Sequence, residues 1–317
     1  MMRIALLDDY QGIGTSMVSW DEVGDDVEVV MFRDHIDDEN ELAEQLAKFD
    51  VVVAMRERTP LRESLLERLG RLRLIVTTGP ANAVIDVAAA NRQGIVVSGT
   101  GGILTPTSEL TWALILALTK RIPGEDAAIR GGAWQESIGV DLSGRRLGLI
   151  GLGRLGAMVA RVGIAFGMDV VAWSQNLTQE RCTEVGVRRV DRTELFTDSD
   201  IVSIHLVLSD RTRGLVGEKE LRSMRRSAFL VNTSRGPIVN EQALLRALNE
   251  NWIAGAGLDV FNIEPLPKSH PLRFMPNTVL TPHIGYVTED CYRLFWKEIV
   301  EDIIAFRQGQ PIRVVGQ

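Results

Sequence analysis

The sequence predicts an α/β protein made of two doubly wound parallel-sheet domains. Short apolar runs alternate with amphipathic segments, a glycine-rich turn lies between one such pair, and 317 residues suffice for two domains. The last amphipathic segment has no following strand, so we expect it to return to the first domain. We therefore expect a first domain over 1–100 plus 287–317 and a second over 101–286.

The first domain is predicted to hold five strands, each a short apolar run. They are expected at 3–7, 28–32, 51–54, 74–77 and 95–97. Apolar residues at helical spacing predict helices over 40–48 and 85–91, and Pro60 is expected to open another near its first position. No G-x-G-x-x-G motif occurs in this half, so its purpose should differ from that of the second. Gly99–Gly102 predicts a linker.

The second domain repeats the alternation of strands and helices. After a strongly apolar helix over 107–119, strands are expected at 147–150, 170–173, 201–206, 228–231, 257–260 and 279–280. The final amphipathic helix should cover 287–307, with Leu294, Phe295, Ile299 and Ile303 on one side.

A glycine motif follows the first strand of the second domain. Gly151, Gly153 and Gly156 fit G-x-G-x-x-G, in the order strand, turn and helix that distinguishes this motif from a chance match. The first glycine permits the tight turn, the second lets backbone approach a pyrophosphate, and the third allows close packing of helix on strand. Amides at the helix N-terminus favour a diphosphate. The motif therefore predicts dinucleotide binding, with a glycine-rich turn lacking a ligand as the alternative.

Composition and charge limit the classes of binding partner and the cellular compartment that we expect. The net charge of −7 argues against nucleic acid or an acidic membrane as the main partner. The two cysteines have no paired spacing, which predicts buried thiols in a reducing compartment. We see neither a signal peptide nor an apolar run of membrane-spanning length, so we expect a cytoplasmic protein, and we expect no metal.

Ligands of open α/β sheets bind beyond the carboxyl ends of the strands, so polar residues directly after strands are the candidates for chemistry. Four segments qualify: 77–82, 232–236, 257–265 and 281–285. The first contains Thr78-Gly79-Pro80 and could aim backbone N–H groups at a carboxylate, although such a loop is more often a simple turn.

Three side chains from the other segments form a chemical unit. Reduction of a 2-oxo acid needs a proton donor at the carbonyl oxygen and a positive group for the carboxylate. His283 suits the first role because histidine exchanges protons near neutral pH. Glu264 could orient the ring and stabilise its protonated form, and Arg235 could bind the carboxylate and polarise the carbonyl. A lone histidine would more often be structural, but the combination favours catalysis.

With these motifs the chain resembles the D-2-hydroxyacid dehydrogenase family, which includes phosphoglycerate dehydrogenases, glyoxylate/hydroxypyruvate reductases, D-lactate dehydrogenases and formate dehydrogenases. The resemblance covers nearly the whole chain and rests on 151–156, 232–236, 258–265 and 281–285. It implies catalytic roles for Arg235, Glu264 and His283 in a cleft between a flavodoxin-like substrate domain and a Rossmann cofactor domain. It also implies a homodimer formed through the cofactor domains. Formate dehydrogenases carry glutamine at the place of Glu264, so that activity is disfavoured.

The resemblance also implies the residues that bind cofactor and substrate. Backbone at Arg154 and Leu155 should contact the pyrophosphate, Asp259 should hold the carboxamide, and the Thr78–Pro80 turn should bind the substrate carboxylate together with Arg235. The remaining expected cofactor contacts are Gly151, Gly153, Gly156, Ser174, Leu206, Val207, Thr212, Thr233, Ser234 and Gly285.

Two departures from the family bear on specificity. Where members that prefer NAD carry an acid after the second strand, this chain has Ser174, so nothing there repels a 2′-phosphate. No arginine follows directly, however, and the choice between NAD(H) and NADP(H) stays open with a slight preference for NADP. Pro80-Ala81 stand where phosphoglycerate-type members usually offer an arginine nearby, which favours a small unphosphorylated acid.

The sequence therefore predicts an NAD(P)-dependent oxidoreductase that interconverts a small 2-oxo acid and its D-2-hydroxy acid. The alternative is a dinucleotide-sensing protein like the family's transcriptional corepressors, which keep the same catalytic residues. A pure acid-binding protein would leave the glycine motif unexplained. The identity of the acid and the physiological direction of the reaction stay open.

Overall fold

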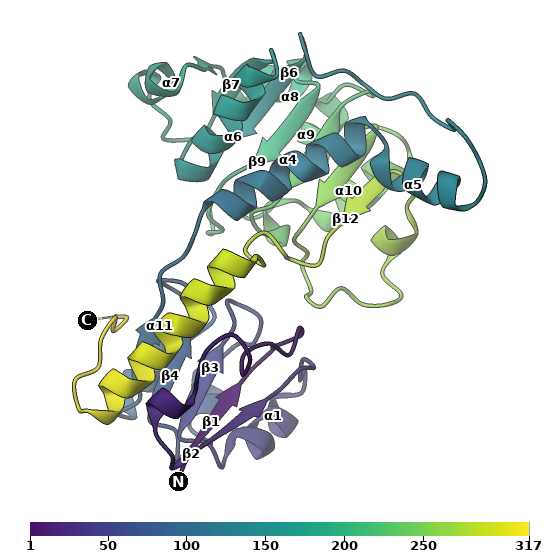
Figure 1. The fold of residues 1–317 in the computed structure, drawn as a ribbon. Coiled ribbons are helices and arrows are strands. Elements are labelled where there is room, and N and C mark those ends of the chain that lie inside the picture. The colour runs from purple at the N-terminus through teal and green to yellow at the C-terminus, as the bar shows by residue number, and fades with distance from the viewer. Residues whose placement is uncertain (317) are drawn as a thin grey trace. The chain divides into compact units, whose positions relative to one another are not determined.

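The computed structural model describes residues 1–316 and divides into two compact α/β units. The first unit contains 1–103 and the segment from Val287 onward, and the second is Leu104–Tyr286. Each unit has one sheet in which every recorded strand pair is parallel (Figure 1). The predicted fold class of two parallel-sheet domains is therefore confirmed.

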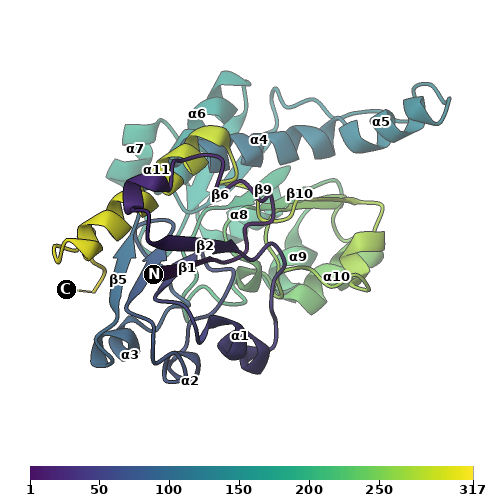
Figure 2. The same cartoon turned by 60° about the horizontal axis from the view of Figure 1, so that its bottom comes forward.

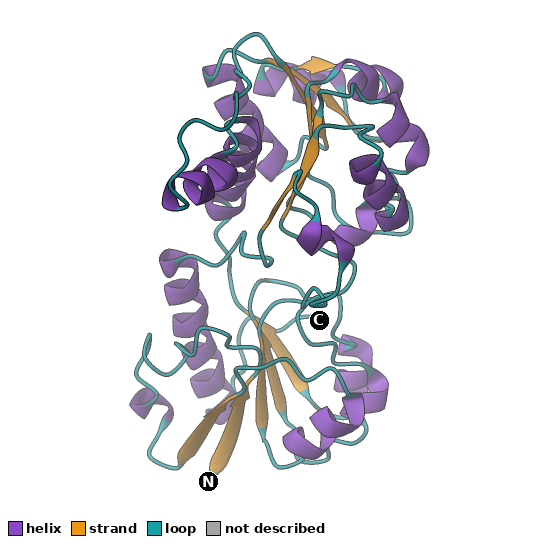
Figure 3. Ribbon diagram, turned by 90° about the vertical axis from the view of Figure 1, so that its right-hand side faces the viewer, coloured by secondary structure: helices purple, strands orange, loops and turns teal. Residues whose placement is uncertain are grey.

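The first unit has a five-stranded sheet in the order β2-β1-β3-β4-β5, covered by helices on both faces (Figure 3). Its strands are β1 (Met2–Leu6), β2 (Val27–Met31), β3 (Val51–Ala54), β4 (Leu74–Thr77) and β5 (Val96–Gly99). Its helices are η1 (Asp21–Val23), α1 (Glu39–Leu46), α2 (Glu63–Leu66), α3 (Val87–Arg92) and α11 (Glu289–Arg307). Strands β3 and β4 are buried throughout, as their uninterrupted apolar sequences require.

The structure corrects two predictions in this unit. The helix expected to open at Pro60 begins only at Glu63, because Leu61 instead forms a parallel bridge with Ile85. The linker expected from Gly99 begins one residue later, since Gly99 is the last residue of β5.

Helix α11 supplies part of the core of the first unit. Tyr292, Phe295, Trp296 and Ile299 on this helix are each 2% exposed or less, and the helix packs against β4. The chain after α11 runs antiparallel to β5 through a bridge between Val314 and Ser98. The C-terminal segment is thus an integral part of this unit.

The second unit has a seven-stranded sheet in the order β12-β11-β10-β9-β6-β7-β8. The strands are β6 (Arg146–Ile150), β7 (Asp169–Trp173), β8 (Arg188–Arg189), β9 (Ile201–Ile204), β10 (Phe229–Asn232), β11 (Gly255–Leu258) and β12 (Thr278–Leu280). The helices are α4 (Thr105–Thr119), α5 (Ile122–Arg130), α6 (Arg154–Ala165), α7 (Gln179–Val185), α8 (Arg192–Asp198), α9 (Glu218–Ser223), η2 (Gly236–Ile238), α10 (Glu241–Asn249) and η3 (Pro271–Phe274). From β6 the strands continue through β7 and β8 on one side of the sheet. The strands β9 to β12 then follow on the other side, so the strand order reverses between β6 and β9.

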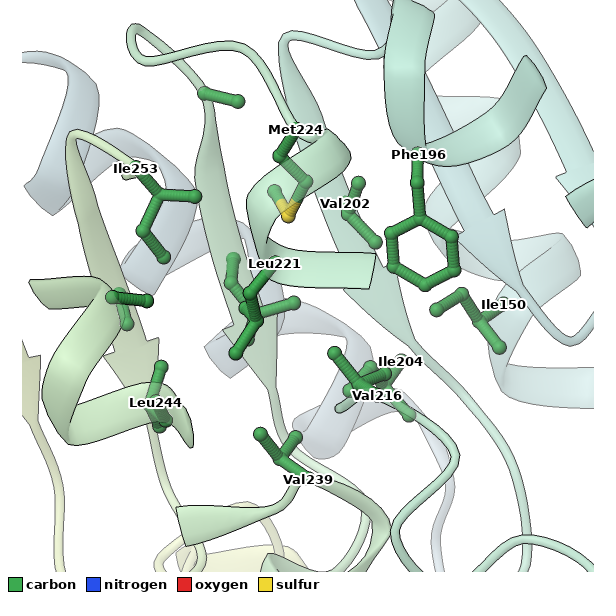
Figure 4. Close-up of a cluster of buried hydrophobic side chains, with 14 of the residues drawn as sticks. Ile150, Phe196, Val202, Ile204, Val216, Leu221, Met224, Val239, Leu244 and Ile253 are labelled. Atoms are coloured by element: carbon green, nitrogen blue, oxygen red, sulfur yellow. The ribbon is translucent and has the colours of Figure 1, made fainter. Parts of the chain in front are cut away.

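Apolar side chains fill both faces of this sheet. Helices α8, α9 and α10 cover one face through a cluster that includes Phe196, Leu221, Met224 and Leu244 (Figure 4). Helices α4, α6 and α7 cover the other face, where Trp112 packs against Phe166 with ring centroids 5.0 Å apart. These layers hold the carboxyl ends of the strands in fixed register.

Helix α5 and the segment after it were not predicted. In Figure 2 this helix lies beyond the end of α4, away from the strands of its unit. It buries no residue, and Ile122, Ile129, Trp134 and Ile138 here are more than half exposed. Among residues 1–316, no helix is both long enough and apolar enough to cross a membrane.

Candidate active site

Three predicted polar segments of the second unit follow neighbouring strands of one sheet. Residues Asn232, Leu258 and Leu280 end β10, β11 and β12, and the register places Asn232 beside Leu258 and Leu258 beside Leu280. Because the strands are parallel, the segments that follow them leave the sheet at the same edge. The structure therefore brings Arg235, Asp259 and His283 to one edge of the second unit.

His283 and Glu264 form a direct pair. The imidazole Nδ1 of His283 lies 2.6 Å from Oε2 of Glu264, and the backbone N–H of Phe261 donates to the other oxygen, Oε1, at 2.7 Å. A carboxylate only accepts hydrogen bonds, so Nδ1 carries a proton and Nε2 is the atom left for exchange with a ligand. Both side chains stay partly exposed, at 19% and 28%. This is the geometry that a general acid and base requires.

The backbone at His283 is held in an uncommon conformation. Its φ of 54° is left-handed, which for a residue other than glycine is infrequent. The His283 N–H donates to the carbonyls of Asp259 at 2.8 Å and Thr281 at 3.0 Å, and these bonds fix the turn. The conformation thus aims the ring at Glu264.

Asp259 braces the same turn with its side chain. Oδ1 accepts from the hydroxyl of Thr281 at 2.6 Å and from the N–H of Ile284 at 2.8 Å, and Oδ2 accepts from the N–H of Gly285 at 3.0 Å. Burial raises the pKa of Asp259 above its ordinary value, and these hydrogen bonds oppose that rise. A carboxylate has about four acceptor positions, and these hydrogen bonds fill three of them.

Arg235 lies on a turn built by its neighbours. The side chain of Asn232 accepts from the N–H of Ser234 and donates to the carbonyl of Arg235, each at 3.0 Å. The guanidinium of Arg235 donates to the carbonyl of Ser234 at 2.7 Å and is partly exposed. Gly236 then packs so closely on backbone of Phe261 that a side chain there would overlap it. The segments that carry Arg235 and Glu264 are thus in backbone contact.

The glycine turn after β6 fits a dinucleotide. Gly151 has a φ of 101°, and a Cβ on Gly156 would collide with the carbonyl of Gly151, so both positions require glycine. A Cβ on Gly153, in contrast, would meet no atom within 4 Å, and no side chain caps the N-terminus of α6 there. Open space beside uncapped N–H groups is what a pyrophosphate needs.

The other predicted cofactor residues lie around this turn and beyond β9. Arg154 and Leu155 open α6, and Ser174 directly follows β7. Thr233 and Thr111 share a hydrogen bond of 2.9 Å, and the hydroxyl of Ser234 donates to the carbonyl of Ile204 at 2.7 Å.

The loop after β9 exposes an apolar side chain. Val207 is 84% exposed, its carbonyl accepts from Thr212 at 2.8 Å, and Leu206 is partly buried. Next to it, burial lowers the pKa of His205 to about 4, so this histidine is neutral at physiological pH. His205 therefore adds no positive charge beside the glycine turn at that pH.

The predicted substrate turn lies in the first unit, and its geometry differs from the expectation. The N–H of Thr78 donates to Ala54 at 3.0 Å and that of Gly79 to Thr100 at 2.8 Å, so neither is free to bind a carboxylate. Pro80 has no N–H. The guanidinium beside this turn is that of Arg56, which donates to the carbonyl of Thr78 at 3.1 Å and pairs with Glu57 at 3.6 Å. An arginine therefore does lie beside this turn, and the preference for an unphosphorylated acid stays a prediction.

Sequence reasoning missed residues that support the predicted segments within each unit. Arg56 follows β3, which pairs with β4, and Thr281 lies 22 positions from the Asp259 carboxylate that it bonds. Thr107 on α4 donates to the carbonyl of Gly285 at 2.9 Å. Within each unit, these contacts depend on strand pairing or helix packing and not on proximity in the sequence. Within residues 1–316, no group of three or more His, Cys, Asp or Glu residues is placed to hold a metal ion.

Comparison with known proteins identifies the family. The model of the D-isomer specific 2-hydroxyacid dehydrogenase NAD-binding domain matches residues 112–285. A glyoxylate reductase of Aeropyrum pernix is 43% identical over 256 residues, covering 78% of this chain and 76% of that protein. A D-3-phosphoglycerate dehydrogenase of Archaeoglobus fulgidus is 34% identical, covering 86% of this chain but 52% of that protein. The crystal structure of a phosphoglycerate oxidoreductase from Vibrio cholerae is similar with a TM-score of 0.93 and 36% identity, covering 98% of this chain and 100% of that one. The chain therefore belongs to the D-isomer-specific 2-hydroxyacid dehydrogenases, which are oxidoreductases with a nicotinamide dinucleotide cofactor.

Proposed function

We propose that the chain interconverts a small 2-oxo acid and its D-2-hydroxy acid, with His283 as general acid and base. The observation that carries this proposal is the 2.6 Å pair of His283 and Glu264, at the same sheet edge as Arg235. The glycine turn after β6 supports a dinucleotide partner, either NAD(H) or NADP(H).

Three side chains share the tasks of proton transfer and substrate binding in the reduction. A bound nicotinamide cofactor would supply the hydride that the carbonyl carbon receives. Nε2 of His283 gives a proton to the carbonyl oxygen, so that the oxo group becomes a hydroxyl. Glu264 stabilises the protonated ring before this transfer, and the Arg235 guanidinium holds the carboxylate and the charge that develops on oxygen. In the oxidation Nε2 takes the proton back.

The remaining cofactor contacts follow the same proposal. Asp259 has one acceptor position for the carboxamide, while its other positions hold the turn of His283. Backbone at Gly153, Arg154 and Leu155 would bind the pyrophosphate at the N-terminus of α6. Val207 offers an exposed apolar surface to the adenosine.

For the substrate we propose a small unphosphorylated 2-oxo acid such as glyoxylate, on which the Aeropyrum relative is named to act. We retain a role for the Thr78–Pro80 turn in substrate binding, with Arg56 in place of backbone N–H groups as its donor. A guanidinium binds carboxylate and phosphate alike, so this turn does not separate the two substrate classes.

The test is the initial rate of NADH and NADPH oxidation by the purified protein over a panel of acids. The panel contains glyoxylate, hydroxypyruvate, pyruvate and 3-phosphohydroxypyruvate. Turnover of an unphosphorylated acid supports the proposal. Turnover of 3-phosphohydroxypyruvate alone would show that the substrate is a phosphorylated acid instead. Tight cofactor binding without turnover of any acid would instead indicate a dinucleotide-sensing protein.

We also propose a homodimer formed through the second unit. Trp134 is 74% exposed and Ile138 90% exposed, next to the exposed isoleucines Ile122 and Ile129 of α5. A second copy of this surface would remove these side chains from water. Light scattering should give twice the 35.1 kDa chain mass, and Trp134→Ser should shift the protein toward monomer. A monomeric parent protein would contradict this part of the proposal.

The free thiols Cys182 and Cys291 are buried, which agrees with a reducing compartment. We propose the cytoplasm as that compartment.

A further inference from the structure

An arginine reaches the glycine turn from a helix that the motif does not include. Nε of Arg181, on α7, donates to the carbonyl of Leu152 at 3.0 Å, and Nη2 donates to that of Gly153 at 3.4 Å. The remaining Nη1 pairs with Glu184 at 2.8 Å. The side chain is 31% exposed, so a positive charge lies at the surface directly beside the turn.

The same turn also adjoins the end of β7. Ile150 pairs with Trp173 in register, and the N–H of Gly151 donates to the carbonyl of Trp173 at 2.9 Å. Ser174 is the next residue, and it is partly exposed. Ser174 and Arg181 therefore flank one turn, although seven positions separate them in the sequence.

The segment between these two residues is short and ordered by local bonds. The N–H of Leu177 donates to the carbonyl of Ser174 at 3.2 Å, and Leu177 is buried. Thr178 caps α7 by accepting from the N–H of Arg181 at 3.2 Å. Residues 174–178 contain no acidic side chain, so none of them would repel an anion at this place.

In dinucleotide-binding folds, the end of this strand faces the adenosine ribose. An acid there binds the 2′-hydroxyl, whereas a nearby arginine accommodates a 2′-phosphate. We propose that Arg181 and Ser174 bind the 2′-phosphate of NADPH, so that the chain prefers NADPH over NADH. This inference rests on the proposed function only in requiring that the glycine turn binds a dinucleotide.

Arg181 can serve such a ligand without leaving its place. Its two bonds to the turn go to neutral carbonyls, which do not neutralise the positive charge. Its one anionic partner, Glu184, is 65% exposed, and such a surface pair exchanges for a stronger partner at little cost. The other acid of this helix, Glu180, has its pKa lowered by hydrogen bonds from its own backbone and from Thr178, which place it at the N-terminus of α7. A phosphate would form a charge-assisted, bidentate contact with the guanidinium.

The test compares two adenosine nucleotides that differ in the 2′-phosphate. Calorimetry should show that the protein binds adenosine 2′,5′-bisphosphate more tightly than adenosine 5′-monophosphate. Arg181→Gln retains an N–H donor for the carbonyls but loses the charge, and it should weaken the bisphosphate roughly 10- to 100-fold. Binding of the monophosphate should change by less than about threefold, since the lost charge faces only the 2′ position.

The same variants should shift cofactor use. The ratio of kcat/KM for NADPH over NADH should fall in Arg181→Gln by a factor similar to the loss of bisphosphate affinity. Ser174→Asp should lower the ratio as well, because a carboxylate repels the phosphate. Arg161→Ala is the matched control: it removes an exposed arginine from α6, roughly 10 Å along the helix from Arg154, and should leave the ratio unchanged.

Equal weakening of both nucleotides in Arg181→Gln would overturn the inference and leave Arg181 as a brace of the turn. Equal affinity of the parent protein for the two nucleotides would overturn it as well. A preference for the bisphosphate without turnover of any acid would refute the proposed reaction and support this inference. Turnover with NADH but not with NADPH would support the proposed reaction and refute this inference.

Discussion

Gly236→Ala tests whether backbone contact between two polar segments positions Arg235 and Glu264, the side chains for which we propose roles in catalysis. A Cβ at this position would lie 2.7 Å from the amide nitrogen of Asn262 and closer still to the carbonyl group of Phe261. Ordinary contact begins at 3.4 Å, and the obstructing atoms are backbone, which cannot rotate away. The segments that carry Arg235 and Glu264 must therefore separate by roughly 1 Å, a displacement that costs about 100-fold in rate.

The assay measures kcat with the preferred acid, together with cofactor affinity and the melting temperature. We expect kcat to fall roughly 100-fold while the affinity for NADH changes little, because the glycine turn after β6 is separate from this contact. Overpacking should also lower the free energy of unfolding by about 1–3 kcal/mol. Gly70→Ala is the control, since a Cβ there meets no atom within 4 Å. If Gly236→Ala kept full turnover, the contact would have no part in positioning the site.

Three further substitutions test separate parts of the structure. Glu264→Gln removes the negative partner of His283 but keeps its shape, so kcat should fall roughly 10- to 100-fold with unchanged NADH affinity; an unchanged kcat would contradict its role. Gly156→Ala forces a Cβ against the carbonyl of the first glycine of the turn, so cofactor affinity should fall by at least roughly tenfold in calorimetry; wild-type affinity would contradict the assigned site. Burial raises the pKa of Asp302 to about 7, despite its bond to Arg313, so the folded protein holds this proton more tightly than the unfolded chain. The stability from this group is therefore complete below pH 3.8 and declines as the pH rises toward about 7; Asp302→Asn should flatten the dependence of the melting temperature on pH in that range, and an unchanged slope would contradict the assignment.

Much of the fold could be predicted because several of its strands are buried on both sides. Val51–Ala54 and Leu74–Thr77 are uninterrupted apolar runs, and the structure has strands over the same residues. The two-residue strand β8 consists of exposed arginines, so it had no apolar signal. Helix α5 buries no side chain against the rest of the chain. Its sequence therefore lacks the stripe of core-facing apolar residues by which a helix is predicted.

The proximity of Arg235, Glu264 and His283 could be predicted because each follows a strand at one sheet edge. His283 and Glu264 meet across 19 positions because β11 and β12 are neighbours. The supporting contacts could not be found in this way. Arg56 and Arg181 each contact a turn that lies far away in the sequence and comes close only through strand pairing or helix packing. No local sequence motif predicts such a contact.

The most direct test of His283 as the proton donor is the turnover of His283→Asn at saturating cofactor and acid. Asparagine tolerates the left-handed backbone of this position, so the turn should keep its shape. Loss of general acid catalysis should lower kcat by at least roughly 100-fold, while the Kd for NADH or NADPH stays within about threefold of the parent value. Near-normal turnover in this variant, with the fold and cofactor affinity intact, would show that another group delivers the proton.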